Sequence, residues 1–150
     1  ESDVKTSLIF NTWDTSGSMD TEIIAELIAI GKTLPEEYYE VVYSWFDTEV
    51  YDAPDFTKPQ GRGGTSFECV DQVLQGKKKI FAHDYNRYSN SNKPSSREIT
   101  RYPDIVIMYT DGDNFHVPTI SFPERWIFIV TEKGTTKYVD QVKGATVWKL

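Results

Sequence analysis

The chain reads LIFNTW at residues 8–13 and DTSGSM at residues 14–19. The first run is short and mostly apolar, which is typical of a largely buried strand. The second run is dominated by turn-forming polar residues, so we expect a tight loop there. Apolar residues then recur at mostly helical spacing over residues 23–30, and Asp20 or Ser18 is the candidate cap of that helix. The opening of the chain therefore predicts a strand, a tight polar loop and a helix.

The same alternation continues along the rest of the chain. We expect further strands at residues 41–46, 105–110, 126–130 and 146–148, a short return strand at 50–51, and short helices at 67–74 and 138–142. Residues 53–64 are rich in proline and glycine and favour a loop, and residues 88–96 favour a surface insertion. Apolar strands that alternate with helices indicate a parallel sheet covered on both faces. Few helical signals fall between residues 111 and 126, so one covering layer should be thin there.

Composition places the chain among ordinary globular domains. Its 150 residues suffice for one continuous core, with 39% hydrophobic and 26% charged residues. The net charge of −7 disfavours nucleic acid as a partner, and no apolar run approaches the roughly 20 residues of a membrane span. Because the first residue is Glu1 rather than Met, we expect residues 1–150 to be a single domain of a longer chain. Cys69 is the only cysteine, which excludes an internal disulfide and favours a reducing, cytoplasmic location.

Three polar clusters lie where strands end or helices begin. The first holds Asp14, Ser16 and Ser18 after a strand, the second ends in Thr65 before a helix, and the third contains Asp111 after a strand. The carboxyl ends of parallel strands lie along one edge of an open α/β sheet, and ligands collect there. We therefore expect the three clusters to meet, although tens of residues separate them in the sequence.

The residue types in these clusters suit a hard divalent cation. Alternate positions in an extended turn point the same way, so Asp14, Ser16 and Ser18 would surround one point. Mg²⁺ prefers oxygen ligands in near-octahedral geometry and usually keeps several waters. With Asp14 and Asp111 as the two carboxylates, the ion would remain able to accept one more anionic ligand. The alternative is that these side chains serve as turn and cap residues without a metal.

The motifs DTSGSM (14–19), GGTSF (63–67) and TDG (110–112) resemble the metal-ion-dependent adhesion site of von Willebrand factor A domains, in the order of that family. The resemblance covers most of the chain. It implies an α/β fold with a doubly wound, Rossmann-like, mostly parallel sheet, helices on both faces, and a short antiparallel edge strand at residues 50–51. It also implies that one cation, Mg²⁺ or alternatively Mn²⁺ or Ca²⁺, is bound by five residues, namely Asp14, Ser16, Ser18, Thr65 and Asp111.

The function implied by the resemblance is metal-dependent protein binding, in which an Asp or Glu of a partner completes the coordination shell. The run FDTEV at residues 46–50 resembles a bacterial and phage branch of the family that occurs behind metallopeptidase-like domains. An AAA+ ATPase of the MoxR type is the partner class that this branch suggests. Two alternatives stay open, a Mg²⁺-dependent phosphatase or nuclease and a module whose metal is structural. Ser16 stands where a haloacid-dehalogenase-like enzyme would need a second aspartate, so binding is favoured over catalysis.

Other residues near the predicted site have less specific signals. Asp47 ends a strand, and we expect it to cap the following turn, with a hydrogen bond to a metal ligand as the alternative. Arg62, Asn114 and Phe115 fall on loops and are candidates for partner contact. We expect structural roles for Cys69, His83 and His116. The alternative for His116 is a place at the rim of the site. Neither histidine has a partner at the spacing of zinc ligands, so we expect no zinc site.

Overall fold

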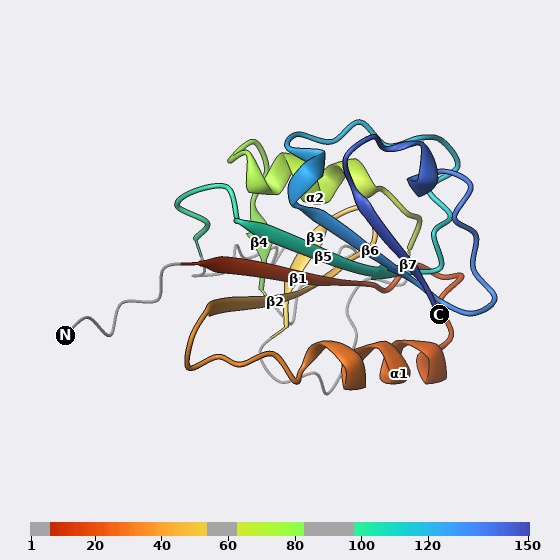
Figure 1. Cartoon of the computed structure of the whole chain (residues 1–150), viewed down its shortest axis with the longest axis horizontal. Helices are drawn as coiled ribbons and strands as arrows, with labels where there is room; N and C mark the ends of the chain where they lie inside the picture. The colour runs from red at the N-terminus through yellow and green to blue at the C-terminus, as the bar shows by residue number, and fades with distance from the viewer. Residues whose placement is uncertain (1–6, 54–62, 83–97) are drawn as a thin grey trace.

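Strands β1 to β7 form one sheet in the computed structural model of the chain, which describes residues 7–53, 63–82 and 98–150 (Figure 1). The order across the sheet is β4-β3-β2-β1-β5-β6-β7, and β3 runs antiparallel to β2 while the other neighbouring pairs are parallel. The elements in chain order are β1 (Leu8–Asp14), α1 (Thr21–Gly31), β2 (Glu40–Phe46), β3 (Val50–Asp52), α2 (Phe67–Leu74), β4 (Ile80–Phe81), β5 (Ile105–Thr110), the 3₁₀ helix η1 (Pro123–Arg125), β6 (Trp126–Val130), the 3₁₀ helix η2 (Val139–Gln141) and β7 (Thr146–Lys149).

The α/β class, the mostly parallel sheet and the helices on both faces are confirmed. The return strand β3 is antiparallel as expected, but it is not the edge of the sheet, because β4 pairs with its outer side. Strand β4 was not predicted, since two residues after a lysine run are too few to show a periodicity. The loop expected at 53–64, the insertion expected at 88–96, and the candidates Arg62 and His83 fall wholly or largely outside the described residues.

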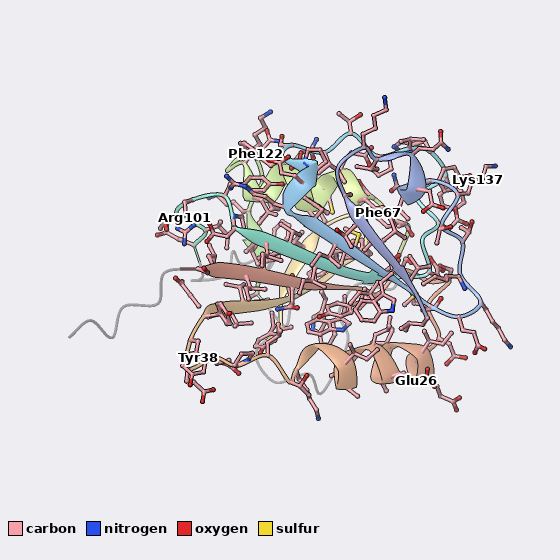
Figure 2. All side chains as sticks on the ribbon, viewed as in Figure 1. Glu26, Tyr38, Phe67, Arg101, Phe122 and Lys137 are labelled. Atoms are coloured by element: carbon pink, nitrogen blue, oxygen red, sulfur yellow. The ribbon has the colours of Figure 1, made fainter. Side chains whose placement is uncertain are left out.

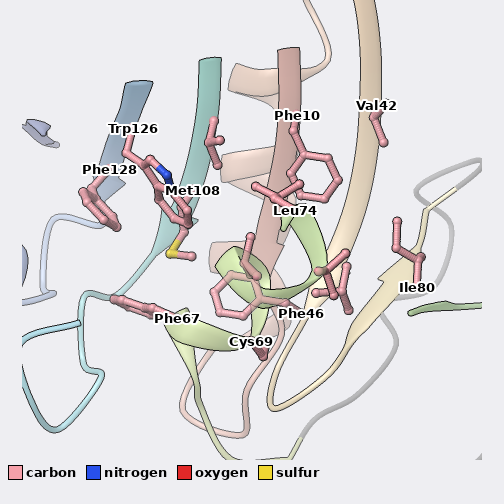
Figure 3. Packing of buried hydrophobic residues seen from close by; sticks show 14 of the residues in the cluster. Phe10, Val42, Phe46, Phe67, Cys69, Leu74, Ile80, Met108, Trp126 and Phe128 are labelled. Carbon is pink, nitrogen blue, oxygen red and sulfur yellow. The ribbon is translucent and has the colours of Figure 1, made fainter. Parts of the chain in front are cut away.

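The two faces of the sheet carry separate cores. Phe10 of β1, Met108 of β5 and Phe128 of β6 belong to the core on the α2 side. The ring of Phe67 of α2 stacks on that of Phe128 there (Figure 3). Cys69 belongs to this core, and burial raises the pKa of its thiol well above the usual range, which suits the structural role expected for it. Ile9 and Trp13 of β1 belong to the second core together with Ile24 and Leu27 of α1. Helix α1 covers the other side of the sheet (Figure 1). No helix in the described parts of the chain has the length and apolarity to cross a membrane.

Helix α1 begins at a cap and ends in close contact with the sheet. The Asp20 side chain accepts a hydrogen bond from the backbone N–H of Glu22 at 3.0 Å, so Asp20 rather than Ser18 is the cap. At the other end Gly31 is buried against the stacked rings of Trp13 and Tyr109, whose centroids are 4.7 Å apart. This contact fixes the helix directly above the first strand.

We expect Gly31→Ala to destabilise the domain by about 1–3 kcal/mol, although alanine normally favours a helix over glycine. A Cβ at residue 31 would lie 2.4 Å from Cζ2 of Trp13 and 2.6 Å from the hydroxyl of Tyr109, so the ring stack would have to move. Urea unfolding measures the change. The control is Ala29→Gly, an exposed position on the same helix that should lose only the helix preference of about 1 kcal/mol. A Gly31→Ala variant as stable as the parent would contradict the packing described here.

The arrangement of the sheet positions three loops at one edge. Strands β1, β2 and β5 are parallel neighbours in the middle of the sheet, with Trp13 in register with both Trp45 and Tyr109. Their carboxyl ends therefore open on the same side, at the right in Figure 1. The loops that follow Asp14, Phe46 and Thr110 all leave from this edge.

Candidate metal site

Asp14 is the last residue of β1 and its side chain is fully buried. Its Oδ1 accepts hydrogen bonds from the backbone N–H of Ser16 at 2.9 Å and from the Ser16 hydroxyl at 2.6 Å. Its Oδ2 accepts a hydrogen bond from the hydroxyl of Thr110 at 2.7 Å. The carboxylate is therefore fixed between the loop that follows β1 and the end of β5.

A chain of oxygen atoms connects the two predicted aspartate ligands. From Asp14 the chain passes through the Ser16 hydroxyl to the Ser18 hydroxyl, with the two Oγ atoms 3.3 Å apart. The Ser18 hydroxyl then donates to Oδ2 of Asp111 at 2.8 Å, across 93 residues of sequence. Four of the five predicted ligand side chains thus lie in one continuous cluster of oxygens, as expected from the strand-end argument.

Backbone contacts hold Asp111 in place. The carbonyl of Asp111 accepts a hydrogen bond from the N–H of Thr135 at 2.8 Å, which ties the end of β5 to the loop after β6. Gly112 follows with φ of 83° and donates its N–H to the Thr110 hydroxyl at 2.9 Å. Thr110 therefore positions both aspartates, since the same hydroxyl donates to Asp14. Thr110 belongs to the TDG motif, but the motif alone does not indicate this role.

Thr65, the fifth predicted ligand, reaches the site through its own loop. The N–H of Gly17 donates to the carbonyl of Gly63 at 2.8 Å, so the glycine loop runs beside the serine loop. Within the described residues the Thr65 hydroxyl makes no hydrogen bond to the other four side chains. The structure therefore brings the segment of Thr65 to the cluster, and its direct ligation stays a prediction.

Asp47 anchors the glycine loop. Its buried carboxylate accepts hydrogen bonds from the backbone N–H groups of Thr48 and Glu49 and from the Tyr51 hydroxyl through Oδ1, and from the N–H of Gly63 through Oδ2 at 3.1 Å. The turn-capping role expected for Asp47 is confirmed. The contact with Gly63 adds that this side chain fixes the approach of the Thr65 segment to the serine loop.

The electrostatics of the cluster favour a bound cation. Burial raises the pKa of Asp14 to about 6, and the nearby charge of Asp111 acts in the same direction, while hydrogen bonds from Ser16 and Thr110 oppose the change. A divalent cation would offset both the desolvation and the mutual repulsion of the two carboxylates. Carboxylate and hydroxyl oxygens are also the donors that Mg²⁺, Mn²⁺ and Ca²⁺ accept. The residues present therefore fit a hard cation.

The described residues contain no group of three or more His, Cys, Asp or Glu side chains placed to hold a metal. A site at this edge would consequently depend on hydroxyl ligands and water in addition to its two carboxylates. Such a donor set disfavours zinc, which takes nitrogen and sulfur ligands. Those two carboxylates match the two positive charges of the ion, and water in the remaining coordination positions can be replaced by a further carboxylate.

The loop after Asp111 is anchored to the start of α2. Asn114 is 1% exposed, and its side-chain oxygen accepts a hydrogen bond from the N–H of Phe67 at 2.8 Å. Burial makes Asn114 a structural residue and corrects the expectation that it contacts a partner. His116 is exposed, and its Nε2 lies 2.7 Å from Oε2 of Glu68. Although partial burial opposes the change, hydrogen bonds from His116 and Asn114 lower the pKa of Glu68, so this carboxylate is ionised at neutral pH.

Phe115 lies between these two anchored residues and is 71% exposed. Its accessibility to a partner is therefore as expected, in contrast to that of Asn114.

Comparison of the chain with known proteins found no matching family model and no matching curated protein.

Proposed function

We propose that this domain binds one divalent cation, Mg²⁺ in the first instance, and uses it to bind an Asp or Glu side chain of a protein partner. The proposal includes membership of the von Willebrand factor A family, which the three motifs suggest. The observation that carries it is the oxygen cluster from Asp14 through Ser16 and Ser18 to Asp111, built at the carboxyl edge of the sheet.

The composition of the cluster supports binding rather than catalysis. Each of the two serine hydroxyls donates a hydrogen bond to a carboxylate, which supports a role as ligand over a role as nucleophile. Among the residues that the structure describes, His116 is the only histidine. It is paired with Glu68 on α2 and anchors a loop. Two carboxylates balance the charge of a divalent cation without filling its coordination shell, and water takes remaining positions, so a partner carboxylate can replace a water.

Ser18 is exposed at the end of the cluster, and Gly17 and Gly64 beside it are also exposed. The side of the cluster toward Ser18 therefore opens to solvent, whereas Asp14 and Ser16 close its base. A partner side chain would approach from the Ser18 side. An AAA+ ATPase of the MoxR type is the partner class that the sequence resemblance suggests testing first.

The experiment is affinity capture of partners from the native source with Mg²⁺, repeated with EDTA and with Asp111→Asn. We expect a partner that is retained with Mg²⁺ and lost both with EDTA and in the variant, because each removes the metal bridge. The matched control is Glu124→Gln, at an exposed carboxylate in η1 before β6, which keeps all five predicted ligands. A partner retained equally in EDTA would reduce the metal to a structural role. Mg²⁺-dependent phosphatase or nuclease turnover that Asp111→Asn abolishes would replace the binding proposal with a hydrolase.

A further inference from the structure

Phe115 presents its ring to solvent four residues after Asp111, with 71% of the residue exposed. Two successive hydrogen bonds connect the two residues. The N–H of Asp113 donates to Oδ1 of Asp111 at 3.2 Å, and the N–H of Phe115 donates to Oδ1 of Asp113 at 3.2 Å. Four residues span at most about 14 Å, so the ring lies within reach of any ligand bound at the cluster.

The exposed position of Phe115 does not result from a loose loop. On one side Asn114 is buried and bonded to the start of α2, and on the other side His116 contacts Glu68. The N–H of Thr119 also donates to Oε2 of Glu68 at 3.2 Å. Both flanks of Phe115 are therefore fixed to α2 while the ring between them stays in water.

This arrangement costs free energy twice. Phe115 has φ of 66°, a left-handed conformation that destabilises a residue other than glycine or asparagine. An exposed phenylalanine also forgoes the stabilisation that its burial would give. Backbone strain at non-glycine residues clusters at ligand-binding sites, and large exposed apolar side chains beside polar sites mark contact surfaces.

Charge restricts what can bind beside the ring. Asp113 on this loop and Asp20 at the start of α1 are acidic, and the whole chain has a net charge of −7. A segment with several carboxylates would be repelled by these groups, whereas one carboxylate directed at the cation would not. Asp113 and Asp20 would attract basic residues in the same segment, whereas Lys133 and Lys137 on the loop after β6, which contacts Asp111, would repel them.

We propose that Phe115 is the apolar contact for a partner segment in which one acidic residue has a large apolar residue within four positions and basic residues around it. This inference rests on the metal-dependent binding proposed above and specifies the chemistry of the partner. The carboxylate binds the cation, and the apolar side chain packs on the ring of Phe115. The ring thereby selects among the acidic segments that a cation alone would accept.

The test uses ¹⁵N-labelled domain and three synthetic peptides, followed by NMR up to millimolar peptide with Mg²⁺ and with EDTA. The peptides are Gly-Leu-Arg-Asp-Arg-Leu-Gly, the same peptide with both leucines replaced by serine, and the leucine peptide with its aspartate replaced by asparagine. We expect the leucine peptide to bind about tenfold more tightly than the serine peptide, since one buried apolar contact is of that order. Phe115→Ser should abolish this difference and leave Mg²⁺ affinity unchanged.

Tyr38→Ser is the matched control. Tyr38 is 69% exposed, close to the exposure of Phe115, but it precedes β2 at the opposite edge of the sheet (Figure 2). This variant should retain the preference for the leucine peptide. Equal Mg²⁺-dependent affinity for the leucine and serine peptides, unchanged in Phe115→Ser, would overturn the role of Phe115 and leave metal-dependent binding intact. Absence of Mg²⁺-dependent binding of any peptide, or equal binding of the asparagine peptide, would overturn the proposed function itself.

Discussion

Asp14→Asn should abolish Mg²⁺ binding and at the same time make the metal-free domain more stable at neutral pH. The buried carboxylate of Asp14 has its pKa raised from the ordinary 3.8 to about 6, with burial as the main cause. A carboxylate whose pKa is higher in the folded state destabilises that state once the pH exceeds the unfolded value. The difference corresponds to about 3 kcal/mol at neutral pH. An amide of the same shape removes that cost.

The net gain in Asp14→Asn should be about 1–3 kcal/mol, because the new NH₂ group would meet neighbours that now donate to the carboxylate. In EDTA, the stability of the parent should fall as the pH rises from about 4 to about 6 and then level off, because the unfolded chain releases this proton first. Asp14→Asn should lack this fall in stability between about pH 4 and about pH 6. Urea unfolding across that pH range, in EDTA, measures both effects.

Mg²⁺ should stabilise the parent and leave the stability of Asp14→Asn unchanged. A ligand that binds the folded state alone stabilises it by about 2.7 kcal/mol at a concentration one hundred times its Kd. We expect this stabilisation in the parent and none in Asp14→Asn. Asp113→Asn, at a neighbouring carboxylate outside the predicted ligand set, should respond to Mg²⁺ as the parent does. An Asp14→Asn protein that is less stable in EDTA and still stabilised by Mg²⁺ would contradict the ligand assignment.

Gly112→Ala should destabilise the domain by more than about 3 kcal/mol and remove Mg²⁺ binding with it. A Cβ at residue 112 would lie 1.8 Å from the backbone oxygen of Thr135, and φ at this position is 83°. The loop after β6 would have to move, and the hydrogen bond from Thr135 to the carbonyl of Asp111 would break as it did so. Overpacking against backbone and a left-handed alanine act in the same direction.

Gly76→Ala separates the two causes. Gly76 has φ of 80°, nearly that of Gly112, but an added Cβ there meets nothing within 4 Å. This variant should lose only the left-handed cost of about 1–2 kcal/mol and should bind Mg²⁺ normally. Equal stabilities of the two variants in urea unfolding would show that the contact with Thr135 does not constrain the site.

Much of this architecture follows from local pattern. The buried run of β1 and the polar loop after it predict their structures, since apolar strands and turn residues are locally encoded. The meeting of Asp14 with Asp111 also follows, because parallel neighbours place their carboxyl ends together. Strand β4 could not be predicted, since pairing with β3 rather than the local sequence pattern makes its two residues a strand.

The parts of the site that could not be predicted depend on long-range hydrogen bonds. Nothing in the sequence around Asn114 indicates that its side chain would be buried against Phe67, 47 residues earlier. The contact of Asp47 with Gly63 could not be predicted either, because it depends on how two loops approach each other. The exposure of Phe115 was expected from its loop position alone, whereas its left-handed backbone depends on the anchors around it.

We propose that the cluster around Asp14 and Asp111 holds one divalent cation. Electron paramagnetic resonance of Mn²⁺ tests it most directly, because the signal of free Mn²⁺ falls as the ion binds. We expect one bound Mn²⁺ per chain, displaced by added Mg²⁺ and absent in Asp14→Asn. A parent domain that leaves the free Mn²⁺ signal unchanged at millimolar metal would contradict it.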